Sequence, residues 1–245
     1  MTVKAIYDFL NEKALFATAE EWDNTGLLVG DPHKEVSRVL VALDATQAAV
    51  DIAQALEADL MVTHHPVIFA PLKRLSAHSV PYRLAAEDIA LIAAHTNLDK
   101  AAGGVNDTLA TRLGLQEVTT AEDGYTRIGK LPQEMTAQDF AAHVAQVLEV
   151  PVRYAGEEPV TTVAVCGGSG GDFMDGCVGL ADAYVTGEVK HHEWLAAEGR
   201  INVVEAGHYA TEVPVVDTLA AWLKEAYPEL SVTIYRDGNP YDVIQ

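Results

Sequence analysis

Residues 37–66 read SRVLVALDATQAAVDIAQALEADLMVTHHP, and this stretch decides the fold class. The runs Ser37–Leu43 and Asp59–Thr63 are short, apolar and rich in β-branched residues, which is typical of buried strands. Between them, residues 46–58 space their apolar side chains as a helix does. A strand, a helix and a second strand in this order predict a parallel pair joined by a crossover helix.

The same alternation continues along the chain. Further strands are predicted at Ile89–Ala94, Thr161–Val165, Ala183–Thr186 and Ile201–Val204. Helices are predicted near residues 81–87, from Asn106 and Thr136 as N-caps, and over residues 216–227, whereas residues 95–104 are predicted to form a loop. The sequence therefore predicts an α/β fold whose largely parallel sheets are flanked by helices.

The segment Glu117–Gly129, EVTTAEDGYTRIG, is polar and contains glycine, so it is the best candidate for a boundary between two lobes. We expect an N-terminal α/β lobe over residues 1–125 and a C-terminal α/β lobe over residues 126–245. Each lobe is expected to be a sheet flanked by helices, with a ligand site at strand carboxyl ends in the cleft between them.

Composition restricts the class of protein. The chain has 245 residues, 49% of them hydrophobic, which is enough for a substantial core. A formal net charge of -20 repels phosphate backbones, so nucleic-acid binding is disfavoured. The amino end does not have the pattern of a signal peptide, and no apolar run reaches the length of a membrane helix. We therefore expect a soluble, cytoplasmic protein in which Cys166 and Cys177 are ordinary thiols.

Residues that can bind metal follow three of the predicted strands. They are His64, His65, His95, Asp99, His208 and Glu212. Because parallel strands present their carboxyl ends at one edge of a sheet, these side chains are expected to converge. Glu212 is expected in the first turn of a helix that Pro214 also enters.

Imidazole and carboxylate donors together suit zinc, manganese, iron or cobalt, and the lack of thiolates argues against a closed structural zinc site. Two carboxylates among the donors favour a pair of divalent ions over a single one, since a carboxylate can bridge two ions. The predicted ligands are His64, His65, Asp99, His208 and Glu212. His95 is the candidate catalytic residue, although a ligand or a residue that fixes Asp99 would also fit. A histidine at a strand end can instead be a hydrogen-bonding residue.

Two other motifs carry weaker signals. His191 and His192 lie within a predicted helix, where adjacent side chains diverge by about 100° and do not easily face one ion. The glycine run Gly167–Gly171 lacks both the end of a P-loop and the GxGxxG spacing, so it fits a phosphate or nucleobase contact and a tight connection equally. No site for an organic cofactor is predicted.

The motifs THHP, HTNLDKAAGGVND, TGEVKHHE and AGHYATE, together with EEWDNTGLLVGDP near the start, resemble the Nif-three-like family. Its bacterial members are often called GTP cyclohydrolase I type 2 homologues. The resemblance runs nearly end to end and implies a dinuclear metal site with the five ligands named above and Glu212 as the bridge. It also implies a homohexamer, and a small-molecule substrate for which GTP is the named candidate. The inserted domain of some members has no room in this chain.

Several functions remain open at this point. The resemblance and the donor set together favour a metal-dependent hydrolase that acts on a purine nucleotide or a similar small molecule. A phosphoester or amide hydrolase could use the same two-metal centre. A non-catalytic, ring-shaped scaffold or regulatory partner that binds metal would carry identical ligands, so the motifs do not decide whether the protein is an enzyme.

Overall fold

The computed structural model describes residues 1–241 and divides into two compact units. The first comprises Met1–Gly104 and Val215–Gly238, and the second comprises Val105–Pro214 with residues 239–241. The expected boundary after residue 125 lies inside the second unit. The polar residues 117–129 that suggested it form an exposed edge strand, a turn and the start of the next strand. Their polarity reflects the exposure of a sheet edge and not a linker.

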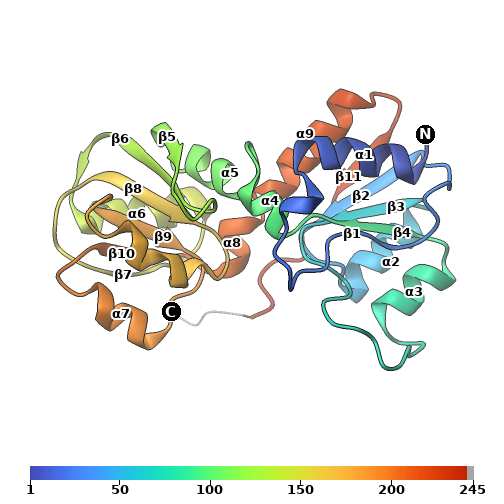
Figure 1. The fold of residues 1–245 in the computed structure, drawn as a ribbon, viewed down its shortest axis with the longest axis horizontal. Helices are drawn as coiled ribbons and strands as arrows, with labels where there is room; N and C mark the ends of the chain where they lie inside the picture. Colours follow the sequence, from blue (N-terminus) through green and yellow to red (C-terminus); the bar gives the residue numbers. More distant parts are fainter. Residues whose placement is uncertain (242–245) are drawn as a thin grey trace. The chain divides into compact units, whose positions relative to one another are not determined.

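The first unit contains a five-stranded sheet in the order β1-β4-β3-β2-β11 (Figure 1). Its strands are β1 (Gly26–Val29), β2 (Arg38–Ala42), β3 (Leu60–Thr63), β4 (Ala90–Ala93) and β11 (Ser231–Ile234). The edge strand β1 is antiparallel to β4, whereas the neighbours from β4 to β11 pair in parallel. The prediction of a parallel pair around the first crossover helix is confirmed.

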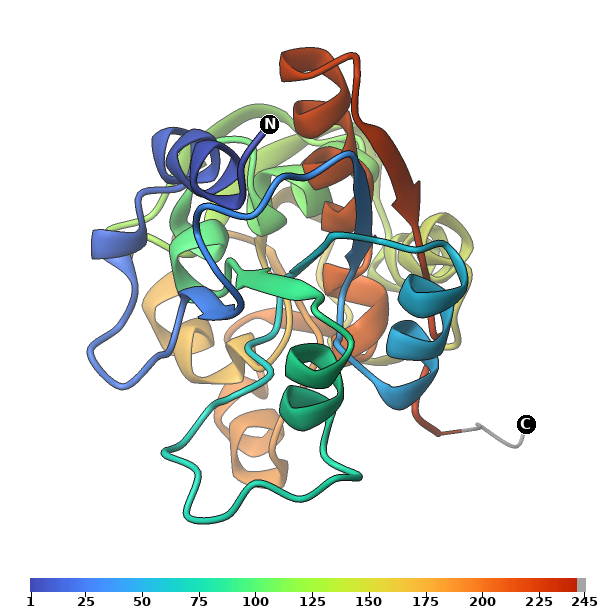
Figure 2. The same ribbon diagram turned by 90° about the vertical axis from the view of Figure 1, so that its right-hand side faces the viewer.

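Helices cover both faces of this sheet (Figures 1 and 2). On one face lie α1 (Val3–Lys13) and α9 (Val215–Ala226), and on the other lie α2 (Gln47–Ala55) and α3 (Val80–Ala86). Side chains of α2 and α3, including Val50 and Leu84, pack against Leu40, Met61 and Leu91 of the strands. Burial on both faces explains why these strands are continuous apolar runs.

Short helices complete the first unit. They are a 3-10 turn, η1 (Phe16–Thr18), and α4 (Thr96–Lys100). The loop expected over residues 95–104 therefore contains a helix. The sequence HTNLD did not indicate this helix because three consecutive residues, Thr96, Asn97 and Leu98, are buried. A helix at the surface buries only one side, so its apolar residues recur every three or four positions.

Asp59 joins the starts of β2 and β3. Its Oδ2 accepts hydrogen bonds from the backbone N–H groups of Ser37 (2.8 Å) and Arg38 (2.9 Å) and from the Ser37 hydroxyl (2.9 Å). Burial raises the pKa of Asp59, but these hydrogen bonds outweigh it and hold the pKa below its usual value of 3.8. A depressed pKa stabilises the fold fully above about pH 4, and the contribution is lost as the pH falls.

We expect Asp59→Asn to lower the free energy of unfolding by about 1–3 kcal/mol at pH 7, because the bonds then lose their charged acceptor. Urea unfolding measured from pH 7 to pH 3 should show the difference from wild type shrinking below pH 4. Glu198→Gln, at an exposed position, is the control and should change stability little. An equal loss at both ends of the pH range would contradict the role of the charge.

The second unit contains a six-stranded mixed sheet in the order β5-β6-β8-β9-β10-β7. Its strands are β5 (Gln116–Thr120), β6 (Arg127–Met135), β7 (Arg153–Ala155), β8 (Val160–Cys166), β9 (Ala183–Thr186) and β10 (Asn202–Glu205). The central strands β8, β9 and β10 pair in parallel, and β5, β6 and β7 pair with their neighbours antiparallel. This sheet is less parallel than the strand and helix alternation predicted.

Helices also cover both faces of the second sheet. They are α5 (Val105–Arg112), α6 (Ala137–Leu148), η2 (Gly170–Cys177), α7 (His191–Ala197) and α8 (His208–Glu212). Alternate residues of β8 serve two cores: Val163 and Val165 pack with α5 and α6, whereas Ala164 packs with η2 and α7. The predicted N-cap Thr136 is confirmed, because its Oγ1 accepts from the N–H of Asp139.

The predicted N-cap Asn106 is wrong. Asn106 lies within α5, and its Oδ1 instead accepts a hydrogen bond of 2.8 Å from the N–H of Gly167. Cys166 and Cys177 are buried, and neither of these described residues forms a disulfide bond. Burial raises the pKa of the Cys177 thiol to about 11, with a smaller contribution from Asp123. Among residues 1–241, no helix combines the length and hydropathy that crossing a membrane requires.

Candidate metal centre

His64 and His65 follow β3 directly, at the carboxyl end of the buried strand LMVT. His64 is fully buried and His65 is half-buried. The N–H of His65 donates to the carbonyl of Leu43, which is the residue after the neighbouring strand β2. The position of the doublet thus comes from the parallel pairing of β2 with β3, as the sequence predicted.

Hydrogen bonds fix the tautomer of both rings. Nδ1 of His64 lies 2.8 Å from the carbonyl oxygen of Ala94, and Nδ1 of His65 lies 2.8 Å from Oδ1 of Asp44. A carbonyl and an ionised carboxylate only accept hydrogen bonds, so each Nδ1 carries the proton. In the neutral rings Nε2 therefore holds the lone pair. This arrangement is the one that metal-binding histidines usually have.

Asp99 is brought to His64 by α4, which starts just after β4. Asp99 Oδ1 lies 3.6 Å from His64 Nε2. The helix is held in place by Asn97, whose Nδ2 donates to the carbonyl of Ala14 at 2.7 Å. Within the first unit, the structure therefore brings together His64 and Asp99, two of the five predicted ligands.

His95 is the N-cap residue of α4, and it pairs with a carboxylate that sequence reasoning missed. Nδ1 of His95 donates to Asp23 Oδ1 at 2.9 Å. The Asp23 side chain is completely buried, and Oδ2 accepts from the N–H of Thr96 (3.1 Å) and from its hydroxyl (2.6 Å). Burial raises the pKa of Asp23, but the bonds from His95 and Thr96 outweigh it and hold the pKa far below its usual range.

Three histidines of the first unit, His64, His65 and His95, form a cluster. The ring centroid of His64 lies 4.8 Å from that of His65 and 5.2 Å from that of His95. The centroids of His65 and His95 are 5.5 Å apart. One nitrogen from each ring lies within 4.8 Å of the other two, a spacing that could hold a metal ion. His95 therefore lies among the candidate donors.

In the second unit, His208 and Glu212 lie at the two ends of α8. Glu212 is the last residue of this short helix and does not lie in the first turn of α9, so that part of the prediction is wrong. The four-residue spacing places both side chains on one face of the helix. His208 Nε2 lies 2.9 Å from Glu212 Oε2, and the Glu212 carboxylate is buried.

A second acidic residue orients His208. Nδ1 of His208 lies 3.1 Å from Oε1 of Glu188 and donates the proton of that hydrogen bond. In the neutral ring, the lone pair of Nε2 then faces the Glu212 carboxylate. Two such groups at 2.9 Å repel each other unless Nε2 also carries a proton or a cation lies beside both of them. The donor set of the second unit therefore fits a divalent metal ion.

The glycine run after β8 packs closely against α8. The N–H of Gly168 donates to Thr211 Oγ1 at 3.0 Å, and a methyl group on Gly168 would lie 2.0 Å from Glu212 Oε1. Gly168 also has a positive φ of 60°, which glycine adopts without strain. Of the two interpretations of GGSGG, the structure favours the tight connection.

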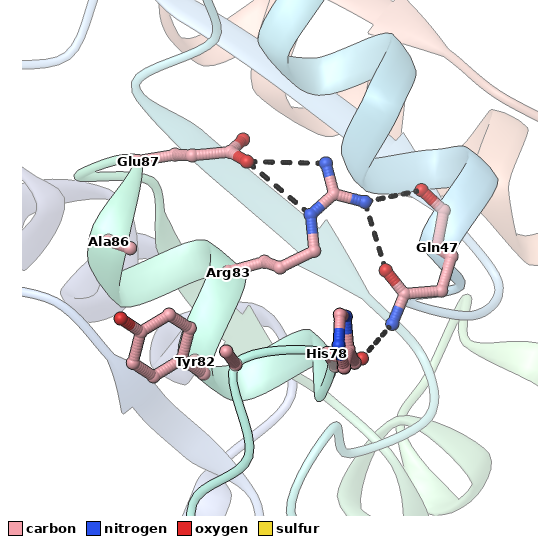
Figure 3. Close-up of a pocket in the computed structure, with 7 residues that line it drawn as sticks. Gln47, His78, Tyr82, Arg83, Ala86 and Glu87 are labelled. Atoms are coloured by element: carbon pink, nitrogen blue, oxygen red, sulfur yellow. Dashed lines mark hydrogen bonds and ion pairs between the residues drawn. The ribbon is translucent and has the colours of Figure 1, made fainter.

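Two other features lie apart from these donors. His191 and His192 begin α7 and are both exposed. A depression of about 620 Å³ lies between α3 and Gln47 (Figure 3). Its guanidinium, Arg83, already binds Glu87 and the Gln47 side chain, so the polar groups there hold α2 and α3 together.

Residues 1–240 match the family model of Duf34/NIF3 (NGG1p interacting factor 3). The chain belongs to this family. The match covers all the segments that carry the donors described above. It also confirms the resemblance that the sequence motifs indicated.

Duf34/NIF3 relatives include two proteins that are each named GTP cyclohydrolase 1 type 2 homolog. The one from Streptomyces coelicolor is 39% identical over 228 residues, which covers 84% of this chain and 80% of the relative. The one from Clostridium perfringens is 32% identical over 241 residues and covers 92% of both. A solved structure of a Staphylococcus aureus hypothetical protein matches with a TM-score of 0.93 at 30% identity, covering 100% of this chain and 99% of the other. A Bacillus cereus protein related to NIF3 matches with a TM-score of 0.90 at 26% identity and the same coverage.

Proposed function

We propose that this chain is a metal-dependent hydrolase that acts on a purine nucleotide or a similar small molecule. Two divalent ions per chain, of zinc, manganese, iron or cobalt, are its proposed cofactors. The proposed ligands are His64, His65, Asp99, His208 and Glu212, with Glu212 shared by both ions. The names of the relatives make GTP the first substrate to test.

One observation carries the metal proposal: four imidazoles hold their Nδ1 proton against an oxygen atom. The acceptors are the Ala94 carbonyl for His64 and the carboxylates of Asp44, Asp23 and Glu188 for His65, His95 and His208. Each ring is thereby prepared to offer the lone pair of Nε2. Histidines that serve only as surface hydrogen-bonding residues have no need of such a consistent arrangement.

Bound divalent ions would supply Lewis acidity and lower the pKa of a water molecule towards neutrality. The chain supplies the proton transfer through His95. Asp23 fixes the ring and stabilises its protonated form, so Nε2 of His95 can take a proton from the attacking water and return it to the leaving group. The carboxylate of Asp23 stays ionised during this exchange because its pKa is held so low.

The Asp23–His95 pair favours an enzyme over a metal-binding scaffold. A completely buried carboxylate that accepts bonds from His95 and Thr96 is costly to place, and His95 is not one of the five proposed ligands, so its orientation supports a role in proton transfer. A proton-transfer residue requires such orientation.

The test is a turnover assay with protein that has been loaded separately with zinc, manganese, iron(II) and cobalt. GTP and a panel of phosphoesters and amides serve as substrates. We expect turnover of at least one compound, and His95→Gln should lower kcat by about 10²–10⁴-fold while metal content stays at the wild-type level. Asp23→Asn should lower kcat less, since the ring remains but its orientation and charge balance are altered.

Three outcomes separate the alternatives. No turnover with any metal, combined with tight metal retention, would reject the hydrolase and favour the metal-binding scaffold. Turnover of phosphoesters or amides but not of GTP would reject the purine nucleotide. A parallel loss of metal and activity in His95→Gln would make His95 a ligand and remove it from the proton-transfer role.

A further inference from the structure

Two large aromatic side chains lie exposed beside the histidine cluster of the first unit. Trp22 is 59% exposed and Phe69 is 56% exposed. Their ring centroids are 5.8 Å apart with an angle of 48° between the planes, and the Trp22 ring lies 6.2 Å from His95. Exposing two adjacent aromatic rings to water costs free energy, and such exposed apolar surface is typical of sites that bind a ligand or a partner.

The backbone beneath this pair is fixed. The side chain of Asp23, the residue after Trp22, is completely buried and bound to His95 and Thr96. Asn24 then donates from Nδ2 to the carbonyl of Ile68, the residue before Phe69, at 2.5 Å. The two aromatic residues are therefore attached to rigid points on the polypeptide, while their rings stay open to solvent.

Phe69 begins a loop that continues to α3 and extends away from the sheet (Figures 1 and 2). This loop carries Lys73 and Arg74, which are both exposed. Within residues 1–241, neither forms an ion pair or a hydrogen bond, although the chain has 36 acidic and 16 basic residues. Other basic residues of this unit, such as Arg83 and Lys100, do bind carboxylates.

The two cations are close to the aromatic pair along the chain. Lys73 is four residues after Phe69, so an extended chain spans at most about 14 Å between their Cα atoms. In a protein of net charge -20, an adjacent lysine and arginine that have no carboxylate partner give this loop a local positive charge that attracts anions.

We propose that Trp22, Phe69, Lys73 and Arg74 form a recognition surface for a planar heteroaromatic ligand that carries a negative charge, of the class of the nucleoside phosphates. The ring stacks on Trp22 and Phe69, and the anionic group binds Lys73 and Arg74. This surface would bind the substrate of the proposed hydrolase, so the inference rests on the proposed function. His95 lies at its edge, which places the ligand next to the proposed proton-transfer residue.

The test is isothermal titration calorimetry of the full chain with GMP, guanosine and ribose 5-phosphate, with and without a chelator. GMP should bind more tightly than either of its parts. Trp22→Ala and Phe69→Ala should each weaken GMP and guanosine by about tenfold, as expected when a stacking side chain is removed. The double variant Lys73→Ala/Arg74→Ala should weaken GMP and ribose 5-phosphate by about two- to fivefold and leave guanosine unchanged.

Matched controls come from other parts of the surface. Tyr154→Ala removes another exposed aromatic ring, and Lys224→Ala removes another exposed cation. Neither should change the affinity for GMP. An equal effect of Tyr154→Ala and Trp22→Ala would overturn the proposal, and so would wild-type affinity for GMP in Trp22→Ala.

Failure of the surface and failure of the hydrolase can be told apart. Protein that binds GMP through Trp22 but turns over nothing would support the surface and reject the hydrolase. If the protein hydrolyses GTP and Trp22→Ala leaves KM unchanged, the hydrolase is supported and the recognition surface is rejected. If sedimentation instead showed that Trp22→Ala changes the oligomeric state without changing GMP affinity, the pair would be a contact between copies of this chain, and the proposal would be wrong.

Discussion

Glu212→Gln is expected to lower the bound metal from two ions per chain to one or fewer, and to weaken the ion that remains. The amide keeps the shape of the buried side chain but removes its charge. In the proposed centre, the charge of Glu212 would offset the repulsion between two divalent ions held close together. Nε2 of His208 lies 2.9 Å from this carboxylate, so an ion proposed to bind both groups would keep only neutral donors there in Glu212→Gln.

Metal content measured after dialysis against graded chelator gives the stoichiometry and the affinity. Asp99→Asn is the informative comparison, because a carboxylate that binds one ion should affect mainly that ion. Glu198→Gln, an exposed position of the second unit, should retain both ions. If Glu212→Gln still bound two ions with wild-type affinity, the proposal that Glu212 bridges them would be wrong.

Gly187→Ala is expected to damage the site although glycine has no side chain that could bind an ion. Gly187 follows β9 directly, and a methyl group there would lie 2.7 Å from the Cα atom of His208, 2.6 Å from the carbonyl of Gly168 and 2.8 Å from Thr211 Oγ1. Two of these atoms belong to the backbone and cannot rotate away, so α8 must shift. We expect a loss of about 1–3 kcal/mol in the free energy of unfolding.

The shift should also weaken metal binding by about 10–100-fold, as changes to the support of ligands typically do. Thermal unfolding and metal titration of the same preparation measure the two effects. Gly176→Ala is the matched control, because a methyl group at Gly176 meets nothing within 4 Å. If Gly187→Ala bound metal like wild type, the close packing of β9 against α8 would not be what positions His208.

The sequence predicted the first sheet and the positions of His64 and His65 because local patterns determine both. β3 is buried on both faces, so its apolar run is unmistakable, and the residues that follow it must lie at the carboxyl edge of a parallel sheet. The ends of β4 and β10 were located by the same reasoning.

The partners of the histidines were not predicted. Asp23, Asp44 and Glu188 lie 72, 21 and 20 residues from the histidines they orient. No periodicity connects them, and an aspartate in EEWDNTG looks like an ordinary surface residue until tertiary packing buries it. The antiparallel edges of the second sheet were missed for a related reason, since β5 and β7 are exposed along their length and lack an apolar pattern.

The first unit is made from two separate parts of the chain, and this affects how it is completed during synthesis. β11 pairs with β2 through Ser231 and Arg38, so the edge of β2 stays unpaired until residue 231 and those after it have emerged from the ribosome. The main part of the second unit, from Val105 to Pro214, emerges in one piece before that point and can fold first. A nascent chain that stalls before residue 231 would then display an unprotected strand edge, which is a site where chains associate wrongly.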